Sequence, residues 1–311
     1  MHDQIVKFSI DVIGPVVVLL VLGKLLYRFG HISDAFVAGG SKLVFNYALP
    51  ALLFMSISQA DFQSAADEQM IALGLSVTAI FFIFSLLSTH MLFTERQDRG
   101  VIIQGCFRAN LGVIGLAYAA KTFNTEDFAQ AAVYMGALIL LYNVLSVWVL
   151  NHYLPRKLKP GQTLLEMIKN PIIVAILLAL MVSYWQLPMP EIATLSLDYF
   201  AQLTLPLALL CTGASIRFGQ MKGHSLALIF ATICKCLLYP LASVALGVTF
   251  NFTHTQLLTV MFMSIAPTAA VSFIMVKNMG GNADLAANIV AITTVVSVPF
   301  TIAGYAWINT L

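Results

Sequence analysis

Long hydrophobic runs follow one another along the whole chain and are separated by short polar stretches. A run of about 20 apolar residues can cross the roughly 30 Å hydrocarbon layer of a bilayer as a helix. The stretches between the runs carry the Gly, Pro, Asn and charged residues that usually end helices. The pattern predicts ten membrane-spanning helices, at residues 8–29, 36–59, 69–93, 100–123, 128–151, 167–187, 192–216, 223–249, 255–278 and 284–308.

The composition agrees with this pattern. Of the 311 residues, 59% are hydrophobic and 10% are charged, whereas a soluble globular chain is about 45–50% apolar and about 25% charged. A water-facing fold cannot bury so much apolar surface, so we expect an all-α integral membrane protein embedded in the lipid bilayer. The first run, near Phe8, lacks a preceding basic cluster and a small-residue cleavage site, so we interpret it as a span and not as a signal peptide.

Basic residues are concentrated on one side of the predicted spans. Most of the 16 Lys and Arg residues lie near the odd-numbered loops, whereas acidic residues such as Asp67, Glu68 and Asp127 collect at the opposite face. Cytoplasmic loops carry an excess of Lys and Arg. This distribution predicts that the odd-numbered loops are cytoplasmic and that both termini lie outside the cytoplasm.

The sequence shows none of the usual motifs of metal, redox or catalytic chemistry. The cysteines lie within apolar runs and the six histidines are scattered near span ends, so we predict neither a disulfide nor a metal site. The chain contains no HExxH, GxSxG or phosphate-binding loop, so we expect neither an enzyme nor a bound cofactor. No basic patch with interleaved aromatic residues points to nucleic acid as a partner.

The two halves of the chain carry helix-breaking residues at matching positions. With one constant offset, the matches are Pro15 with Pro171, Pro50 with Pro206, and Ala109–Gly115 with Ile265–Val271. The repeat divides the chain into residues 1–153 and 154–311, with five spans each. An odd number of spans inserts the second copy upside down. Inverted repeats are typical of secondary transporters, whose substrate site lies near the middle of the bilayer between the repeats.

One pair of these matches interrupts two predicted spans. Pro267 lies in the middle of residues 255–278, where proline removes a backbone donor and clashes with the carbonyl four residues back. Asn110 and Gly112 interrupt the matching span, residues 100–123. Two broken helices that cross at mid-depth bring together the N-termini of their second halves, which attract anions. The alternative is that the proline only kinks its helix and the glycine only permits close packing.

Polar residues near the predicted breaks are candidate ligands. Asn110 either binds the substrate or caps the second half-helix. Thr268 and Ser272 either contact the substrate or satisfy freed backbone carbonyls. Asn143, in the fifth span, either contacts the substrate or bonds a neighbouring helix. Arg108 either draws anions inward or extends its side chain to the membrane interface, and we favour the second role.

Four stretches, taken together and in order, resemble the auxin efflux carrier family. They are KLVFNYALPALLF (Lys42–Phe54), NPIIVAILLAL (Asn170–Leu180), LPLALLCTGASI (Leu205–Ile216) and CKCLLYPLASV (Cys234–Val244). The family includes bacterial permeases assigned to malate and malonate, and the plant exporters of auxin. The resemblance covers nearly the whole chain. It departs at Leu111, where many members have a second proline at the first crossing.

The resemblance implies a scaffold of spans 1, 2, 6 and 7, which forms a homodimer. It implies a transport domain of spans 3–5 and 8–10, which moves like an elevator across a bacterial inner membrane. Pro50, Ala51 and Phe54 would then line the scaffold side of the pocket. Lys235 in span 8 would lie near the crossing, where it supports the crossing or takes the place of a coupling cation. The alternative for Lys235 is a structural bond to a nearby carbonyl.

We therefore expect a secondary transporter for a small organic anion, a carboxylate of the auxin or dicarboxylate type. The half-helix N-termini, Asn110 and a basic residue favour an anion, and no carboxylate pair is placed to hold a cationic substrate. The alternative is a Na⁺-coupled organic-anion symporter of the bile-acid-carrier type, which needs cation sites beside the crossing.

Overall fold

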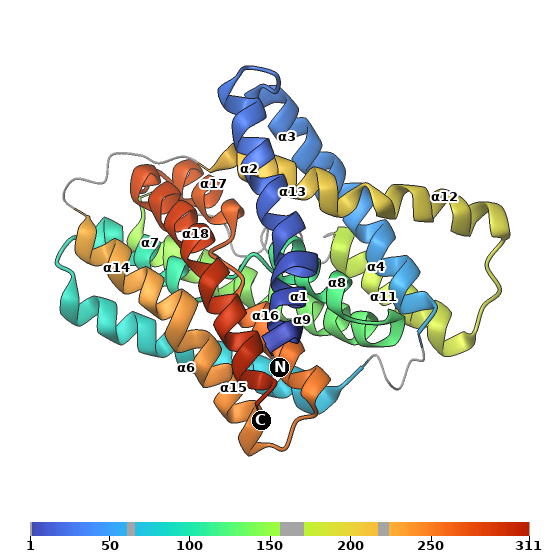
Figure 1. The fold of residues 1–311 in the computed structure, drawn as a ribbon. Coiled ribbons are helices and arrows are strands. Elements are labelled where there is room, and N and C mark those ends of the chain that lie inside the picture. Colours follow the sequence, from blue (N-terminus) through green and yellow to red (C-terminus); the bar gives the residue numbers. More distant parts are fainter. Residues whose placement is uncertain (1, 61–65, 156–170, 217–223, 311) are drawn as a thin grey trace.

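The computed structural model describes residues 2–60, 66–155, 171–216 and 224–310. All regular secondary structure in these ranges is helical, and short π-helical segments carry the label η (Figure 1). The first half contains α1 (His2–Phe8), η1 (Ser9–Ile13), α2 (Gly14–Arg28), α3 (Asp34–Leu43), η2 (Val44–Ala48), α4 (Leu49–Ser58), α6 (Glu68–Leu92), α7 (Arg96–Phe107), η3 (Leu111–Gly115), α8 (Leu116–Thr122) and α9 (Thr125–Tyr153). The second half contains α11 (Pro171–Trp185), α12 (Glu191–Gln202), α13 (Thr204–Ser215), α14 (Ser225–Ile233), η4 (Cys234–Leu238), α15 (Tyr239–Thr249), α16 (His254–Ile265), α17 (Ala270–Asn278) and α18 (Ala283–Ile308). The predicted all-helical fold is confirmed for the described residues.

Seven helices in the described ranges are long and apolar enough to cross a membrane. They are Ile5–Arg28, Asp34–Ser58, Glu68–Leu92, Thr125–Tyr153, Glu191–Ser215, Ser225–Thr249 and Ala283–Ile308. Each coincides with one of the predicted spans, and their ends differ from the predicted ones by a few residues.

The other three predicted spans are not single long helices in the described ranges. Residues 100–123 contain most of α7 followed by η3 and α8, and residues 255–278 contain α16 and α17. Of residues 167–187, the structure describes α11 and the turn after it, because the residues before Pro171 lie outside the described ranges.

Polar residues in the predicted loops begin several helices. Asp67, Asn124 and Asn282 each accept a hydrogen bond from the backbone N–H three residues further on, at 2.9, 2.8 and 3.0 Å. These side chains replace one of the hydrogen bonds that the first turn of a helix lacks. The breaker residues of the sequence therefore act as helix caps.

Three π-helical segments stand directly before prolines that lie within spans. Pro15, Pro50 and Pro240 each occupy an early position of the helix that follows η1, η2 or η4. A proline ring clashes with the carbonyl four residues back, and the wider π-turn relieves that clash. The three spans therefore continue through their prolines.

The helices pack in two groups. In the first helix group, α2 and α3 pack against α13, and α4 packs against α11 and α12. In the second helix group, α6, α7 and α9 pack on one another, and α14 to α18 pack around them. Figure 1 shows the first group at the top and right and much of the second group at the left. The surface between the groups is where a cavity lies.

Two glycines permit the closest approach within the first helix group. A Cβ atom at Gly23 of α2 would collide with backbone atoms of Leu210 in α13. A Cβ atom at Gly213 of α13 would collide with backbone atoms of Leu20 in α2. Since the obstacles are backbone atoms, a side chain at either position forces the helices apart.

We predict that Gly213→Ala destabilises the protein by about 1–3 kcal/mol, the usual cost of overpacking. Gly39→Ala is the matched control, because a Cβ atom at Gly39 of α3 meets nothing within 4 Å. Alanine also favours the helix over glycine by up to about 1 kcal/mol. Thermal unfolding in detergent measures both variants, and equal melting temperatures would contradict the reciprocal contact.

Candidate functional site

Two helices of the second group are interrupted in their buried middle. α7 ends at Phe107 and η3 begins at Leu111, while α16 ends at Ile265 and α17 begins at Ala270. Pro267 explains the second interruption, because a proline cannot continue the hydrogen-bond ladder of a helix. The residues between the half-helices are buried, so their backbone groups need protein partners.

The first interruption lies slightly before its predicted position. The sequence pattern placed it at Asn110–Gly112, whereas residues 108–110 lie outside the helices and Gly112 lies inside η3. The capping role considered for Asn110 is also wrong, because its side chain makes no capping hydrogen bond. The physical reason is pairing: Ala109 pairs with the other interrupted helix, so the chain leaves the helix where that pairing begins.

The two interruptions are hydrogen-bonded to each other through an antiparallel β-bridge. The N–H of Asn110 donates to the carbonyl of Pro267 at 2.7 Å. The N–H of Ala269 donates to the carbonyl of Arg108 at 3.0 Å. In hydrocarbon no water replaces a missing backbone partner, so each interruption supplies partners for the other.

Thr268 links the second interruption to α7 and to α18 by hydrogen bonds. Its Oγ1 donates to the carbonyl of Gly105 at 2.8 Å, one of the carbonyls that the end of α7 leaves without a helical partner. Its backbone N–H donates to Oγ1 of Thr293 in α18 at 3.1 Å. The residue is 1% exposed. Of the two roles considered for Thr268, these bonds correspond to the satisfaction of freed backbone groups and not to substrate contact.

A cavity of about 1200 Å³ lies between the two helix groups and reaches the interruptions. Its wall on the first group comes from α3, η2, α13 and the start of α11. Its wall on the second group comes from residues 108–113, α9 and α17, with two residues of α18. The charged side chains that line it are those of Lys42, Arg108, Lys277 and Asp34, so basic groups outnumber acidic ones.

The beginnings of two half-helices form part of the cavity wall. They are represented by Leu111, Gly112 and Val113 of η3, and by Ala270 and Val271 of α17. The backbone N–H groups of these residues donate to no described residue. Unpaired N–H groups at a helix start attract negative charge. Each interrupted helix therefore places a helix start with unpaired N–H groups in the cavity wall.

Arg108 lines the cavity, so the predicted extension of its side chain to the interface is wrong. The residue is 7% exposed. Its Nη1 donates to the carbonyl of Tyr142 at 3.2 Å, and its Nη2 donates to Oδ1 of Asn143 at 2.8 Å. The sequence analysis favoured the interfacial role although Arg108 lies only two residues before Asn110. A basic residue directly beside a predicted break was the available signal.

The predicted site residues of the second group are divided between the cavity and the protein interior. Asn110, Gly112 and Asn143 line the cavity. Pro267 belongs to the β-bridge and lies outside the cavity wall. Ser272 also lies outside it, is 3% exposed, and has a hydroxyl without a partner among the described residues.

The predicted scaffold residues Pro50, Ala51 and Phe54 do not line the cavity. Leu49 stands in contact distance of Gly112, 3.2 Å from where a Cβ atom of that glycine would be. The wall on this side is instead formed earlier in the chain, by residues of α3 and η2 such as Ser41, Lys42, Phe45 and Asn46.

Lys235 lies fully buried in η4 and outside the cavity wall. Its Nζ donates to the carbonyl of Ser264, in the last turn of α16 before the interruption. It also lies 4.9 Å from the ring centre of Tyr239. A cation is favourable at the C-terminal end of a helix. Lys235 thus bonds a backbone carbonyl next to the crossing. This is the structural role that the sequence analysis considered as the alternative.

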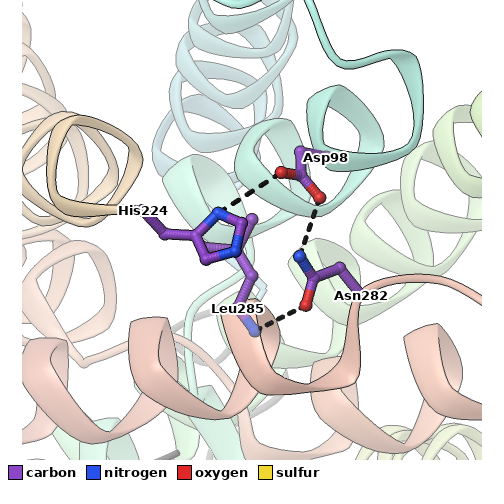
Figure 2. Close-up of polar contacts among 4 residues, drawn as sticks. All are labelled: Asp98, His224, Asn282 and Leu285. Carbon is purple, nitrogen blue, oxygen red and sulfur yellow. Dashed lines mark hydrogen bonds and ion pairs between the residues drawn. The ribbon is translucent and has the colours of Figure 1, made fainter. Parts of the chain in front are cut away.

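A polar cluster fixes the beginning of α7 (Figure 2). Oδ2 of Asp98 lies 3.4 Å from Nδ1 of His224, and Oδ1 of Asp98 accepts from Nδ2 of Asn282 at 2.9 Å. His224 stands before α14, and Asn282 caps α18 through the N–H of Leu285. The cluster joins three helix starts, and α7 carries the first interruption at its other end.

Comparison with known proteins shows the family of the chain. A family model described as membrane transport protein matches residues 8–162 and 155–305. The chain therefore belongs to this family, the auxin efflux carrier family, as its sequence motifs predicted. Together with the seven long apolar helices of the described ranges, the match identifies a multi-pass membrane protein of a transporter family.

Relatives that match most of the chain carry transporter names. An uncharacterized transporter of Methanothermobacter thermautotrophicus is 22% identical over 297 residues, which cover 93% of this chain and 95% of that protein. The uncharacterized transporter YfdV of Escherichia coli K12 is 24% identical over 264 residues, 81% of this chain and 82% of YfdV. An uncharacterized transporter of Methanocaldococcus jannaschii is 22% identical over 307 residues, 96% of this chain and 98% of that protein.

We predict that Thr293→Val destabilises the protein by about 1–3 kcal/mol, because the buried N–H of Thr268 loses its acceptor. Thr294→Val is the matched control. The hydroxyl of Thr294 only donates to the carbonyl of Val290 in its own helix, at 2.6 Å, so its loss leaves no backbone donor unpaired. Melting temperatures in detergent compare the two variants, and a control that melts as low as Thr293→Val would refute the role of this bond.

Proposed function

We propose that the protein is a secondary transporter for a small organic anion and that the substrate carries a carboxylate. The observation that carries this proposal is the cavity at the crossing of the two interrupted helices. Its wall contains two helix starts with unpaired N–H groups, and the charged side chains that line it are mostly basic. Its volume of about 1200 Å³ exceeds the usual range for small-molecule sites, about 300–1,000 Å³, and leaves room for a small acid together with water.

The proposed mechanism is elevator-type alternating access. The second helix group contains both interruptions and is the proposed transport domain, and the first helix group is the proposed scaffold. The packing supports the inverted repeat of residues 1–153 and 154–311. α2 packs on α13, while α11, the repeat counterpart of α2, packs on α4, the counterpart of α13. Such reciprocal packing is expected when a pseudo-twofold axis relates two repeats.

The cavity's position supports the proposed orientation. Its lining residues Asp34, Ser215 and Lys277 lie close to the first, seventh and ninth loops, which are on the side rich in Lys and Arg. We propose that this side is cytoplasmic, in a bacterial inner membrane, and that the described conformation is open toward the cytoplasm. A movement of the second helix group would then expose Asn110 and its neighbours to the opposite side.

We predict that Asn110→Ala lowers the uptake of a labelled carboxylate into proteoliposomes about tenfold, the usual scale for loss of a hydrogen bond to a charged ligand. The substitution keeps the backbone bond to Pro267, so the crossing remains. The assay uses labelled acetate, succinate and benzoate. Asn309→Ala is the control, because that amide only bonds the carbonyl of Tyr305 near the C-terminus. Unchanged uptake by Asn110→Ala would remove the residue from the site.

We also predict that transport persists when Na⁺ is replaced by choline. The Nζ of Lys235 already bonds a carbonyl at the end of α16, where a Na⁺-coupled carrier would use such a carbonyl for its cation. The measurement is initial uptake at equal ionic strength in the two salts. Loss of uptake in choline would favour the alternative, a Na⁺-coupled organic-anion symporter.

A further inference from the structure

We propose that Arg108 binds the charged end of the substrate and that Asn143 is its positioning residue. The inference rests on the proposed function and adds the group that recognises the anion. It comes from the contacts of the guanidinium group, which lies in the cavity wall between the first interruption and α9.

The backbone of Arg108 is fixed at the crossing. It lies in the interruption between α7 and η3, and its carbonyl accepts the N–H of Ala269 from the other interrupted helix. The position of the side chain is therefore set by the same β-bridge that holds both half-helices. An anion bound there would also be close to the unpaired N–H groups of Leu111 and Ala270, which line the same cavity.

The guanidinium group keeps donors for a ligand. Arginine has five N–H donors, and the described residues accept from two of the nitrogens, Nη1 and Nη2. Both acceptors, the carbonyl of Tyr142 and Oδ1 of Asn143, are neutral. No carboxylate of the described residues pairs with Arg108. The group is thus oriented by two neutral contacts while its charge stays available.

Arg108 differs from the buried Lys235 in that it lines the cavity, and a purely structural role explains its contacts less well. A buried cation without an opposite charge is unfavourable in a low-dielectric environment, and a neutral side chain could join α9 to the interruption at lower cost. The other basic lining residues, Lys42 and Lys277, are exposed, so solvent screens their charges. Arg108 is 7% exposed, so solvent screens its charge least. Among the basic lining residues, it is therefore the one at which pairing with an anion is most favourable.

The shape of the donor group indicates the chemical class of the ligand. A guanidinium group is planar and presents paired N–H groups that match the two oxygens of a carboxylate. Arg108, Tyr142 and Asn143 all belong to the second helix group, so the bound carboxylate would travel with the proposed transport domain. Lys42, on α3, belongs to the first group. We expect Lys42→Gln to change the rate of transport more than the affinity.

The test measures ligand binding to the purified full chain in detergent, independently of transport. The probes are acetate, succinate and benzoate, each compared with its neutral amide, and the readout is the thermal shift as a function of ligand concentration. We expect at least one carboxylate, and not its amide, to stabilise the wild-type protein. Arg108→Gln should weaken its binding roughly 10- to 100-fold, and Arg28→Gln, an exposed arginine outside the cavity wall, should not.

The variant Asn143→Asp tests whether Asn143 positions Arg108 for the ligand or only holds α9 against the first interruption. The aspartate keeps an acceptor at the same place but puts a carboxylate beside the guanidinium, so it should occupy Arg108 and prevent binding of the probe. Thermal stability without ligand should be retained, because the contact between α9 and the interruption remains. Wild-type affinity in Asn143→Asp would overturn the inference, since a merely structural contact tolerates this exchange.

Labelling of the wild-type protein keeps the inference testable if Arg108→Gln does not fold. Phenylglyoxal modifies accessible guanidinium groups, and peptide mass spectrometry locates the adducts. The carboxylate that stabilises the protein should protect Arg108 and leave Arg28 labelled. Equal labelling of Arg108 with and without that carboxylate would refute the inference alone. If no carboxylate stabilises the wild-type protein, the proposed substrate class fails together with it.

Discussion

The rest of the structure depends on one constraint, the need to pair backbone groups where two helices are interrupted in the protein interior. A single interrupted helix would leave donors and acceptors unpaired in an environment without water. In this protein the two interruptions lie against each other, and two backbone hydrogen bonds between them pair groups that would otherwise lack partners. Thr268 then pairs with a carbonyl of α7 and a hydroxyl of α18. Each interruption is therefore tolerated because the other is present.

The same arrangement creates the polar end of the cavity. Pairing consumes the groups that face the other interruption, but the first N–H groups of η3 and α17 remain unpaired among the described residues. Arg108 is held beside them through Tyr142, whose own hydroxyl lies 2.9 Å from that of Tyr239, and the latter lies 2.7 Å from Oγ1 of Thr78. This chain of hydroxyl groups anchors α9 to α15 and α6. The acceptor that orients the guanidinium is thus fixed by the core of the second helix group.

The sequence predicts the parts of this architecture that depend on local chemistry. Apolar runs specify the helices. Pro267 interrupts its helix through its own ring, independently of how the helix packs against the rest of the protein. Asn110 and Gly112 located the other break to within two residues. The contacts of Arg108 were not predictable in this way, because Asn143 lies far along the chain and only the folded structure brings it close. That Pro50 lies outside the cavity wall was not predictable for a similar reason, since it depends on how α4 packs in the folded structure.

The two interruptions have different causes, and this difference connects the site to the crossing. The second contains Pro267, so its break is imposed by covalent structure. The first has Leu111 in place of a proline, so its extended backbone is held by tertiary contacts: the β-bridge, and the two bonds from Arg108 to α9. A ligand bound by Arg108 would act on one of the contacts that hold this break open. In the proposed mechanism, occupancy of the cavity is therefore coupled to the geometry of the first interruption more directly than to that of the second.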